Sequence, residues 1–251
     1  MSETRTREQS IIGRGLRAGW LCSQRLLATG RPPRVEKDYA SHLPVLLGLA
    51  RIFDLRSVLE FGCGYFSTLA FLDRSAFPLL TSLRSFESDA TWLARVGGLA
   101  GSDLRLQTRL VEEPMETVLG ELSPFGYDLI FVDHSIDAGK RSATIRALAG
   151  WCADSALVVI HDFDVEIYRK SARAFPHRFE FRALNPSTGL VWKRKDVDRR
   201  RLQLLNHTVC CHSRRLAPDD RAGWVELFDA TPGLGKKNAY NPAILVSQNT
   251  R

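Results

Sequence analysis

The chain has 251 residues, of which 44% are hydrophobic and 25% are charged, and both values are close to the averages of globular proteins. This composition excludes a disordered chain, a collagen-like repeat and a small disulfide-stabilised domain. The net charge is +7, and no apolar run approaches the roughly 20 residues that a membrane-spanning helix needs. Five cysteines without a CxxC pair suit a reducing compartment, so we expect a cytoplasmic protein.

The positive charge is concentrated at the two ends of the chain. Residues 1–37 contain eight Lys or Arg and three Asp or Glu, residues 196–251 contain nine and six, and residues 38–195 contain eighteen and nineteen. A core that bound a nucleic-acid backbone would show the reverse distribution, so a nucleic-acid partner is not expected. We interpret the chain as a basic N-terminal helical extension (1–37), a central domain (38–195) and a C-terminal extension packed on that domain (196–251).

The N-terminal extension contains a short basic amphipathic helix, because Ile12, Leu16 and Trp20 recur every four residues with arginines between them. Such a helix packs on the domain, packs on a second subunit of a homodimer, or lies on an anionic membrane surface. A transit peptide is a further alternative, which Glu3 and Glu8 disfavour. The sequence leaves these alternatives open.

From residue 37 onward, the hydrophobic pattern alternates between helices and strands. Helices are expected over residues 37–53, 67–73, 89–99, 115–122, 140–151 and 165–175. Strands are expected over residues 57–61, 83–86, 104–110, 127–132, 156–160, 178–183 and 189–193. The last two strands are too close in sequence for a crossover helix, so they should pair antiparallel. Two more helices, over residues 199–210 and 218–228, precede an irregular tail.

This alternation predicts an α/β fold with a Rossmann-like, doubly wound sheet. The sheet should contain seven mostly parallel strands with an antiparallel last strand, covered by helices on both faces. In such a sheet, ligands bind beyond the carboxyl ends of the strands, at the point where the strand order reverses. The residues that follow each strand are therefore the first candidates for a functional site.

The first strand ends in a glycine turn. Gly62 and Gly64 permit a tight turn and a close approach to a ligand. Ser67 is a candidate N-cap of the next helix, whose free N–H groups can bind an anion. A dinucleotide-binding fingerprint has a third glycine where Ser67 stands, which disfavours a nicotinamide or flavin cofactor.

Polar residues follow three other strands. The second strand ends at Glu87, whose carboxylate can accept two hydrogen bonds from a ribose diol. The fourth ends at Asp133 and His134, and the fifth at His161 and Asp162. Because the carboxyl ends of parallel strands share one edge of the sheet, these groups should surround one cleft. The alternative is that they cap helices or pair with nearby basic residues, namely Lys140, Arg141 or Arg169.

The segments at these strand ends resemble the motifs of class I S-adenosylmethionine-dependent methyltransferases, in particular a bacterial group that resembles small-molecule methyltransferases. The first motif of that family, an acid followed by GxG, is similar to LEFGCGYFST, and the end of its second strand is similar to FESDATWL. Its fourth and fifth strand ends are similar to YDLIFVDHS and LVVIHDFD, and its antiparallel seventh strand is similar to the hairpin RFEFRA and GLVWKR. The resemblance covers about residues 38–195.

The resemblance implies how the cofactor S-adenosylmethionine is bound. It implies that Gly62, Cys63 and Gly64 lie against the methionine part, that Glu60 faces the ammonium group and that Glu87 holds the ribose hydroxyls. Ser67, the candidate helix cap, completes the expected cofactor site. The reaction implied is methyl transfer to an oxygen or nitrogen of a small-molecule acceptor.

Methyl transfer also requires that the acceptor loses a proton. Asp133 is the first candidate for the base or the residue that orients it, followed by His134 and His161, with Asp162 at the same edge. In the catechol-type branch of the family, acids at the fourth and fifth strand ends hold a divalent metal such as Mg²⁺. Asp133 and Asp162 stand in comparable places, although Phe163 replaces an Asn of that branch.

Two other functions suit the same fold. The first is a non-catalytic nucleotide-binding module, which has no need of the strand-end acids. The second is a nicotinamide-dependent oxidoreductase, which Ser67 disfavours. A further cluster, His207, Cys210, Cys211 and His212, lacks the two separated ligand pairs of a structural zinc site, so we interpret it as a polar helix face.

Overall fold

The computed structural model describes residues 37–112, 114–194 and 196–234. The basic helix expected around residues 12–20 lies outside the described residues. Seven strands of the described chain form one sheet: β1 (Ser57–Phe61), β2 (Ser82–Glu87), β3 (Leu106–Leu110), β4 (Leu129–Val132), β5 (Leu157–Ile160), β6 (His177–Phe181) and β7 (Thr188–Trp192). Each matches a predicted strand with small shifts at its ends.

The strand order confirms the predicted α/β fold. It runs β3-β2-β1-β4-β5-β7-β6, with β7 antiparallel to both β5 and β6 and all other pairs parallel. From β1 the chain builds outward to β2 and β3 on one side, then returns to add β4 on the other. The order therefore reverses between β1 and β4, and a ligand site is expected at the carboxyl ends of these two strands.

The helices differ from the prediction mainly at their ends. The α-helices are α2 (Leu43–Ile52), α3 (Thr68–Phe71), α4 (Ala90–Ala100), α5 (Ala138–Trp151), α6 (Glu166–Ser171), α7 (Arg199–His212) and α8 (Arg221–Ala230). The helix expected over residues 37–53 is divided into a 3-10 turn, η1 (Lys37–Ala40), and α2. Pro44 lies in the first turn of α2, a position that suits proline because its missing N–H has no partner there.

Three further segments form 3-10 turns. The expected helix over residues 115–122 is η2 (Met115–Glu121), and η3 (Pro124–Gly126) precedes β4. The expected helix over residues 165–175 ends in η4 (Ala172–Ala174). These differences leave the layers of the fold unchanged.

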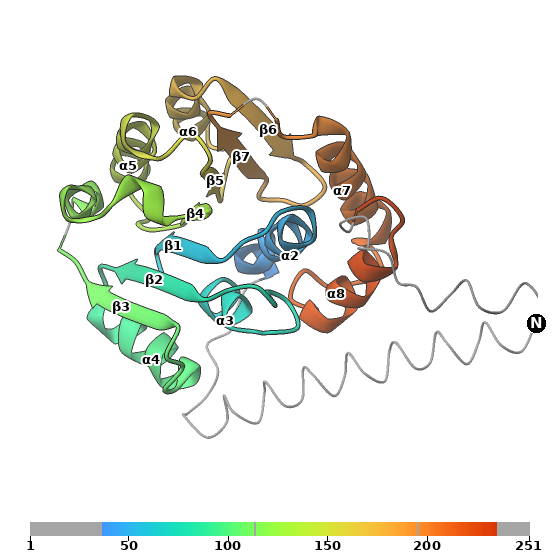
Figure 1. Cartoon of the computed structure of the whole chain (residues 1–251), viewed down its shortest axis with the longest axis horizontal. Coiled ribbons are helices and arrows are strands. Elements are labelled where there is room, and N and C mark those ends of the chain that lie inside the picture. The colour runs from blue at the N-terminus through green and yellow to red at the C-terminus, as the bar shows by residue number, and fades with distance from the viewer. Residues whose placement is uncertain (1–36, 113, 195, 235–251) are drawn as a thin grey trace, which may run out of the picture.

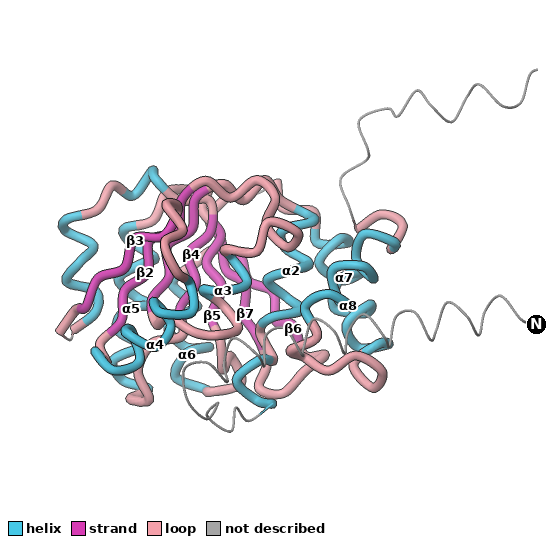
Figure 2. The backbone as a smooth tube through the Cα atoms, turned by 90° about the horizontal axis from the view of Figure 1, so that it is seen from below, coloured by secondary structure: helices cyan, strands magenta, loops and turns pink. Residues whose placement is uncertain are grey.

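The two faces of the sheet are covered by different helices (Figures 1 and 2). One hydrophobic cluster joins α2, α3, α7 and α8 to one set of alternate strand residues, which includes Val58, Phe131 and Val159. A second cluster joins α5, α6 and η2 to the other set, which includes Ile130 and Val158. The central strands β1, β4 and β5 are thus buried on both faces, as is typical of a parallel sheet.

The C-terminal helices α7 and α8 pack beside α2 and belong to the first of these clusters (Figure 1). Leu205 of α7 and Trp224 of α8 are fully buried. A Cβ atom at Gly48 of α2 would lie 2.1 Å from a methyl group of Leu205, so the glycine permits the close contact between α2 and α7. The described part of the C-terminal extension therefore contributes to the main core.

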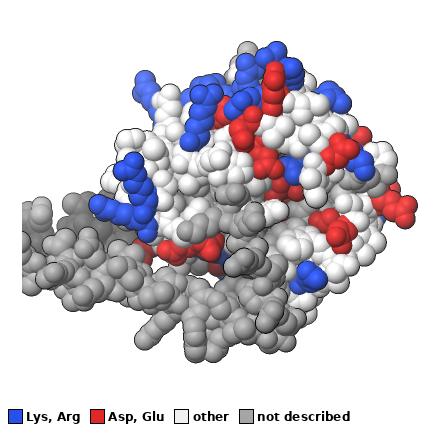
Figure 3. All heavy atoms as spheres, turned by 180° about the vertical axis from the view of Figure 1, so that it is seen from behind, with Lys and Arg blue, Asp and Glu red and all other residues white. Residues whose placement is uncertain are grey.

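Acidic and basic side chains are interspersed on the face seen in Figure 3, although Lys and Arg gather along its upper part. Among the described residues, no helix is both long and apolar enough to cross a membrane.

Candidate active site

Side chains beyond the ends of β4 and β5 continue the alternation of the strands. The hydrogen bonding between neighbouring strands extends one residue beyond β4 and β5. The N–H of Asp133 donates to the carbonyl of Phe61 at 2.8 Å, and the N–H of His161 donates to the carbonyl of Val132 at 3.2 Å. Alternate residues point to the same face of a sheet. Asp133 and His161 therefore lie on the side of the sheet that α2 covers.

Asp133 and His161 form a buried polar pair. The Oδ1 atom of Asp133 lies 3.1 Å from Nδ1 of His161, and the side chain of His161 is 3% exposed. Burial opposes ionisation of Asp133, but the charges of His161 and Arg141 outweigh it and lower the pKa to about 2. Burial would lower the pKa of His161, but the charge and hydrogen bond of Asp133 raise it above its usual value. The charge and the hydrogen bond of each residue thus favour the charged form of the other.

Arg141 of α5 connects Asp133 to Asp162. One guanidinium nitrogen, Nη1, lies 3.2 Å from Oδ1 of Asp133 and donates to Oδ2 of Asp162 at 2.8 Å. The other nitrogens donate to the backbone carbonyls of His134 and Ser135. Asp133 and Asp162 thus both form ion pairs with Arg141, which is one of the alternatives that the sequence left open. A cation already bridges the two carboxylates that were expected to hold Mg²⁺.

His134 lies apart from this cluster. Its ring is 1% exposed, and its Nε2 atom lies 2.9 Å from Oγ1 of Thr144 on α5. The physical reason is the strand alternation, because consecutive residues point to opposite faces of the sheet. The structure therefore brings Asp133, His161 and Asp162 together and places His134 on the other side.

Ser41 and His42, between η1 and α2, reach the same cluster and were not identified from the sequence. Oγ of Ser41 lies 2.9 Å from Nε2 of His161. The ring of His42 packs edge-on against that of His161, with centroids 4.6 Å apart, and 4.9 Å from the ring of Phe131. Burial lowers the pKa of His42 to about 3, so its ring is neutral. Pro44 was the signal available in the sequence, because it marks the start of α2 and leaves Ser41 and His42 outside the helix.

The glycine turn after β1 contacts the end of β4. Gly62 has φ +91°, and a Cβ atom there would lie 2.5 Å from the carbonyl oxygen of Asp133. Both observations require glycine, because other residues rarely adopt this conformation and no side chain fits. The turn expected to hold the cofactor and the candidate catalytic residue Asp133 are therefore in direct backbone contact.

Glu60 is buried directly below this turn. Its Oε2 atom accepts hydrogen bonds from Oγ1 of Thr68 at 2.7 Å and Oγ of Ser85 at 2.6 Å. Thr68 in turn accepts a hydrogen bond from the N–H of Gly64 at 2.9 Å. Burial raises the pKa of Glu60 to about 7, although hydrogen bonds from Ser67, Ser85 and Thr68 favour the ionised form. The Oε1 atom is buried and has no hydrogen-bond partner within the described chain.

Glu87 and Trp92 hold the middle residue of the turn. Glu87 accepts a hydrogen bond from the N–H of Cys63 at 3.1 Å, and its other oxygen accepts from the N–H groups of Ser88 and Asp89. The indole N–H of Trp92 donates to the carbonyl of Cys63 at 2.5 Å. The peptide groups on both sides of Cys63 are therefore fixed by residues at or after the end of β2.

Ser67 occupies the N-cap position of α3, but its side chain makes no capping hydrogen bond. The helix that follows has only four residues, Thr68–Phe71. The helix that was expected to bind an anion at its N-terminus is therefore short. The hydroxyl that accepts a hydrogen bond from the glycine turn belongs to Thr68.

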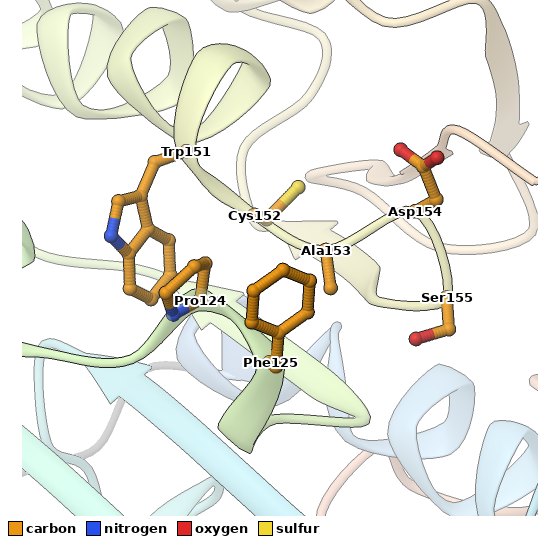
Figure 4. Close-up of a pocket in the computed structure, with 7 residues that line it drawn as sticks. All are labelled: Pro124, Phe125, Trp151, Cys152, Ala153, Asp154 and Ser155. Carbon is orange, nitrogen blue, oxygen red and sulfur yellow. The ribbon is translucent and has the colours of Figure 1, made fainter.

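Two other features lie away from this cluster. A pocket of about 460 Å³ is lined by Pro124, Phe125 and residues 151–155, which precede β4 and β5 and so lie at the opposite end of these strands (Figure 4). On α7, Sγ of Cys211 lies 3.5 Å from Nε2 of His207 on the exposed surface. Neither feature includes a residue expected to bind the cofactor.

The chain is similar to several solved structures. No family model matches the chain, and no curated protein matches it. Solved structures similar to it include cofactor-bound Rv0187 from MTB (TM-score 0.48, 21% identity, 72% of this chain and 91% of that one). A proposed O-methyltransferase from Klebsiella pneumoniae gives a TM-score of 0.46 at 20% identity, over 74% of this chain and 90% of its own. A spermidine synthase in complex with a transition-state analogue gives a TM-score of 0.48 at 14% identity, over 75% of this chain and 74% of its own. The roles of individual residues therefore have to be inferred from the geometry of this chain.

Proposed function

We propose that this protein transfers a methyl group from S-adenosylmethionine to an oxygen or nitrogen of a small-molecule acceptor. The observation that carries this proposal is the contact between the glycine turn and the end of β4. Gly62 lies against the backbone of Asp133 where the strand order reverses, so a cofactor held by the turn would lie next to the pair of Asp133 and His161.

The residues around the turn fit the chemical groups of the cofactor. The unpartnered Oε1 atom of Glu60 suits the positively charged ammonium group of the methionine part. Gly62 and Gly64 leave room for the close approach of a ligand to the backbone. Three backbone N–H groups already donate to Glu87, so its remaining lone pair would accept a hydrogen bond from one ribose hydroxyl. When bound, the cofactor supplies a methyl group on an electrophilic sulfonium.

The protein itself would position the acceptor and remove its proton. Asp133, with a pKa of about 2, stays ionised and acts through its negative charge. That charge can stabilise a proton on His161, or it can help to hold a metal ion that acidifies the acceptor. Side-chain exposures of 21% for Asp133 and 31% for Asp162 leave this edge of the cluster accessible to a ligand.

The two rival functions receive less support. A nicotinamide oxidoreductase is disfavoured because Ser67 stands in place of the third glycine of its fingerprint. A non-catalytic binding module would have no use for the buried polar cluster around His161, because burying charged groups is costly even when they are paired. The cluster is therefore better explained by chemistry on a bound molecule.

Calorimetric titration of the full chain with S-adenosylhomocysteine and, separately, with NAD tests the proposal. We expect S-adenosylhomocysteine to bind one molecule per chain and NAD to bind at least about 100-fold more weakly, a difference of about 3 kcal/mol. Tighter binding of NAD would refute the proposal in favour of the oxidoreductase. Binding of S-adenosylhomocysteine without methyl transfer to any hydroxyl or amine acceptor would favour the binding module.

A further inference from the structure

His42 is a buried imidazole without a hydrogen-bond partner in the part of the chain that the structure describes. The residue is 2% exposed, and neither Nδ1 nor Nε2 is bonded. Each buried polar atom left unpaired costs about 1–3 kcal/mol, so buried polar groups in native proteins nearly always have partners. The His42 ring packs against the rings of Phe131 and His161, but this packing provides no hydrogen-bond partner for its nitrogens.

We propose that His42, His161 and Asp133 bind one divalent transition-metal ion. One ligand atom from each of these residues lies within 4.8 Å of the other two. The three residues come from separate segments, namely the start of α2, the end of β5 and the end of β4. Tertiary packing therefore assembles the group.

The spacing of His161 and Asp133 within the group suits coordination of one ion. Two ligand atoms that each lie about 2.1 Å from a metal, at roughly a right angle, are about 3 Å apart. Nδ1 of His161 and Oδ1 of Asp133 are separated by 3.1 Å. The other nitrogen of His161 lies 2.9 Å from Oγ of Ser41. A histidine that binds a metal commonly donates its second ring N–H to such an oxygen, which fixes the orientation of the ring.

The ligand types select the metal. Two imidazoles with one carboxylate suit Zn²⁺, Co²⁺, Ni²⁺ or Fe²⁺, whereas Mg²⁺ prefers oxygen ligands. The all-oxygen pair of Asp133 and Asp162 is bridged by Arg141. The imidazole-containing group is therefore a different site from the expected magnesium site, although both use Asp133.

The charges around the group allow an ion to bind. Arg141 opposes a cation, but Asp133 and Asp162 together outweigh its single positive charge. Asp133, the most exposed ligand of the three at 21%, leaves one side of the group open to water or an acceptor oxygen. An ion there would lower the pKa of an acceptor hydroxyl. This catalytic role rests on the proposed function, whereas metal binding by the three residues does not.

Binding of Co²⁺ and Zn²⁺ to the full chain tests the inference directly. The variant His207→Ala serves as the parent, because it removes the exposed histidine that contacts Cys211. We expect one Co²⁺ per chain by equilibrium dialysis, visible d–d absorption bands of bound Co²⁺, displacement of Co²⁺ by Zn²⁺ and no displacement by Mg²⁺ at equal concentration.

His42→Phe is the informative variant, because it keeps an aromatic ring beside Phe131 and removes both unpaired nitrogens. We expect it to weaken Co²⁺ binding at least about 100-fold, more than loss of an outer-shell partner costs, while the metal-free protein stays at least as stable as the parent. His177→Phe is the matched control, because His177 also has an unpartnered buried nitrogen and stacks on Trp192 instead. It should bind Co²⁺ like the parent.

The inference is overturned if the parent binds neither Co²⁺ nor Zn²⁺, or if His42→Phe binds Co²⁺ as tightly as His177→Phe. If His42→Phe does not fold, Asp133→Asn replaces it, and unchanged Co²⁺ affinity in Asp133→Asn has the same consequence. Failure of the proposed function is recognised separately, because it appears as loss of S-adenosylhomocysteine binding in calorimetry without metal.

Discussion

Replacing Glu60 by Gln should stabilise the free protein and weaken its binding of S-adenosylhomocysteine. Glu60 is fully buried, and burial raises its pKa from 4.5 to about 7. Since the folded-state pKa lies above the unfolded value, the folded chain binds the extra proton between about pH 4.5 and 7, and its stability falls as the pH rises through that window. At 1.36 kcal/mol per pKa unit, the ionised carboxylate costs about 3 kcal/mol above pH 7.

Gln has nearly the same size and keeps an oxygen that can accept from Thr68 or Ser85. We therefore expect Glu60→Gln to raise the free energy of unfolding in urea by up to about 3 kcal/mol at pH 8 and to change it little at pH 4.5. The ammonium group of the ligand would lose its carboxylate partner, and a hydrogen bond to a charged group contributes about 1.5–3 kcal/mol. Calorimetry at pH 8 should therefore show roughly 10- to 100-fold weaker binding of S-adenosylhomocysteine.

Glu121→Gln is the matched control, because Glu121 is an exposed carboxylate paired with Arg109. Exposed ion pairs contribute little to stability. Glu121→Gln should therefore change neither the free energy of unfolding at pH 8 nor the affinity for S-adenosylhomocysteine. Lower stability of Glu60→Gln at pH 8 would refute the argument from burial. Unchanged affinity would refute the assignment of Glu60 to the ammonium group.

Three further predictions concern the other parts of the site. Glu87→Gln should weaken S-adenosylhomocysteine binding by about 1–3 kcal/mol in calorimetry, and an unchanged affinity would show that Glu87 does not hold the ribose. Asp133→Asn should lower methyl-transfer turnover by roughly 100-fold or more with little change in S-adenosylhomocysteine affinity, whereas Asp154→Asn, in the pocket at the opposite end of the strands, should keep parental turnover. Removing residues 1–30 should leave S-adenosylhomocysteine binding intact, and a folded truncation that no longer binds it would place the N-terminal segment in the site.

Local sequence patterns determined the fold of this protein. The short apolar runs and the helical periodicity between them predict all seven strands, and the short connection between β6 and β7 predicts their antiparallel pairing. These features depend on residues close together in the sequence, because burial of alternate or helically spaced side chains is a local pattern. The glycine turn after β1 is also a local feature of the sequence, and Gly62 has the positive φ that glycine favours.

The strand ends were also predictable, but their grouping was only partly so. The topology brings Asp133 and His161 to one edge, as expected from parallel strands. The separation of His134 could have been derived from the period of two in a strand, which sends neighbouring residues to opposite faces. Whether Glu60, Glu87 and Asp133 serve the proposed reaction stays a prediction for the experiments above.

Only the tertiary structure decided which side chains complete the cluster. Ser41 is 120 residues away from His161 in the sequence, yet the two side chains are in contact. The same packing of α2 on the sheet places His42 beside His161, and α5 brings Arg141 between Asp133 and Asp162. No local pattern encodes these contacts, because they depend on how the helices pack across one face of the sheet and at its edge. A buried side chain takes its partners from the elements packed around it, so the chemistry of the site is set by the fold as a whole.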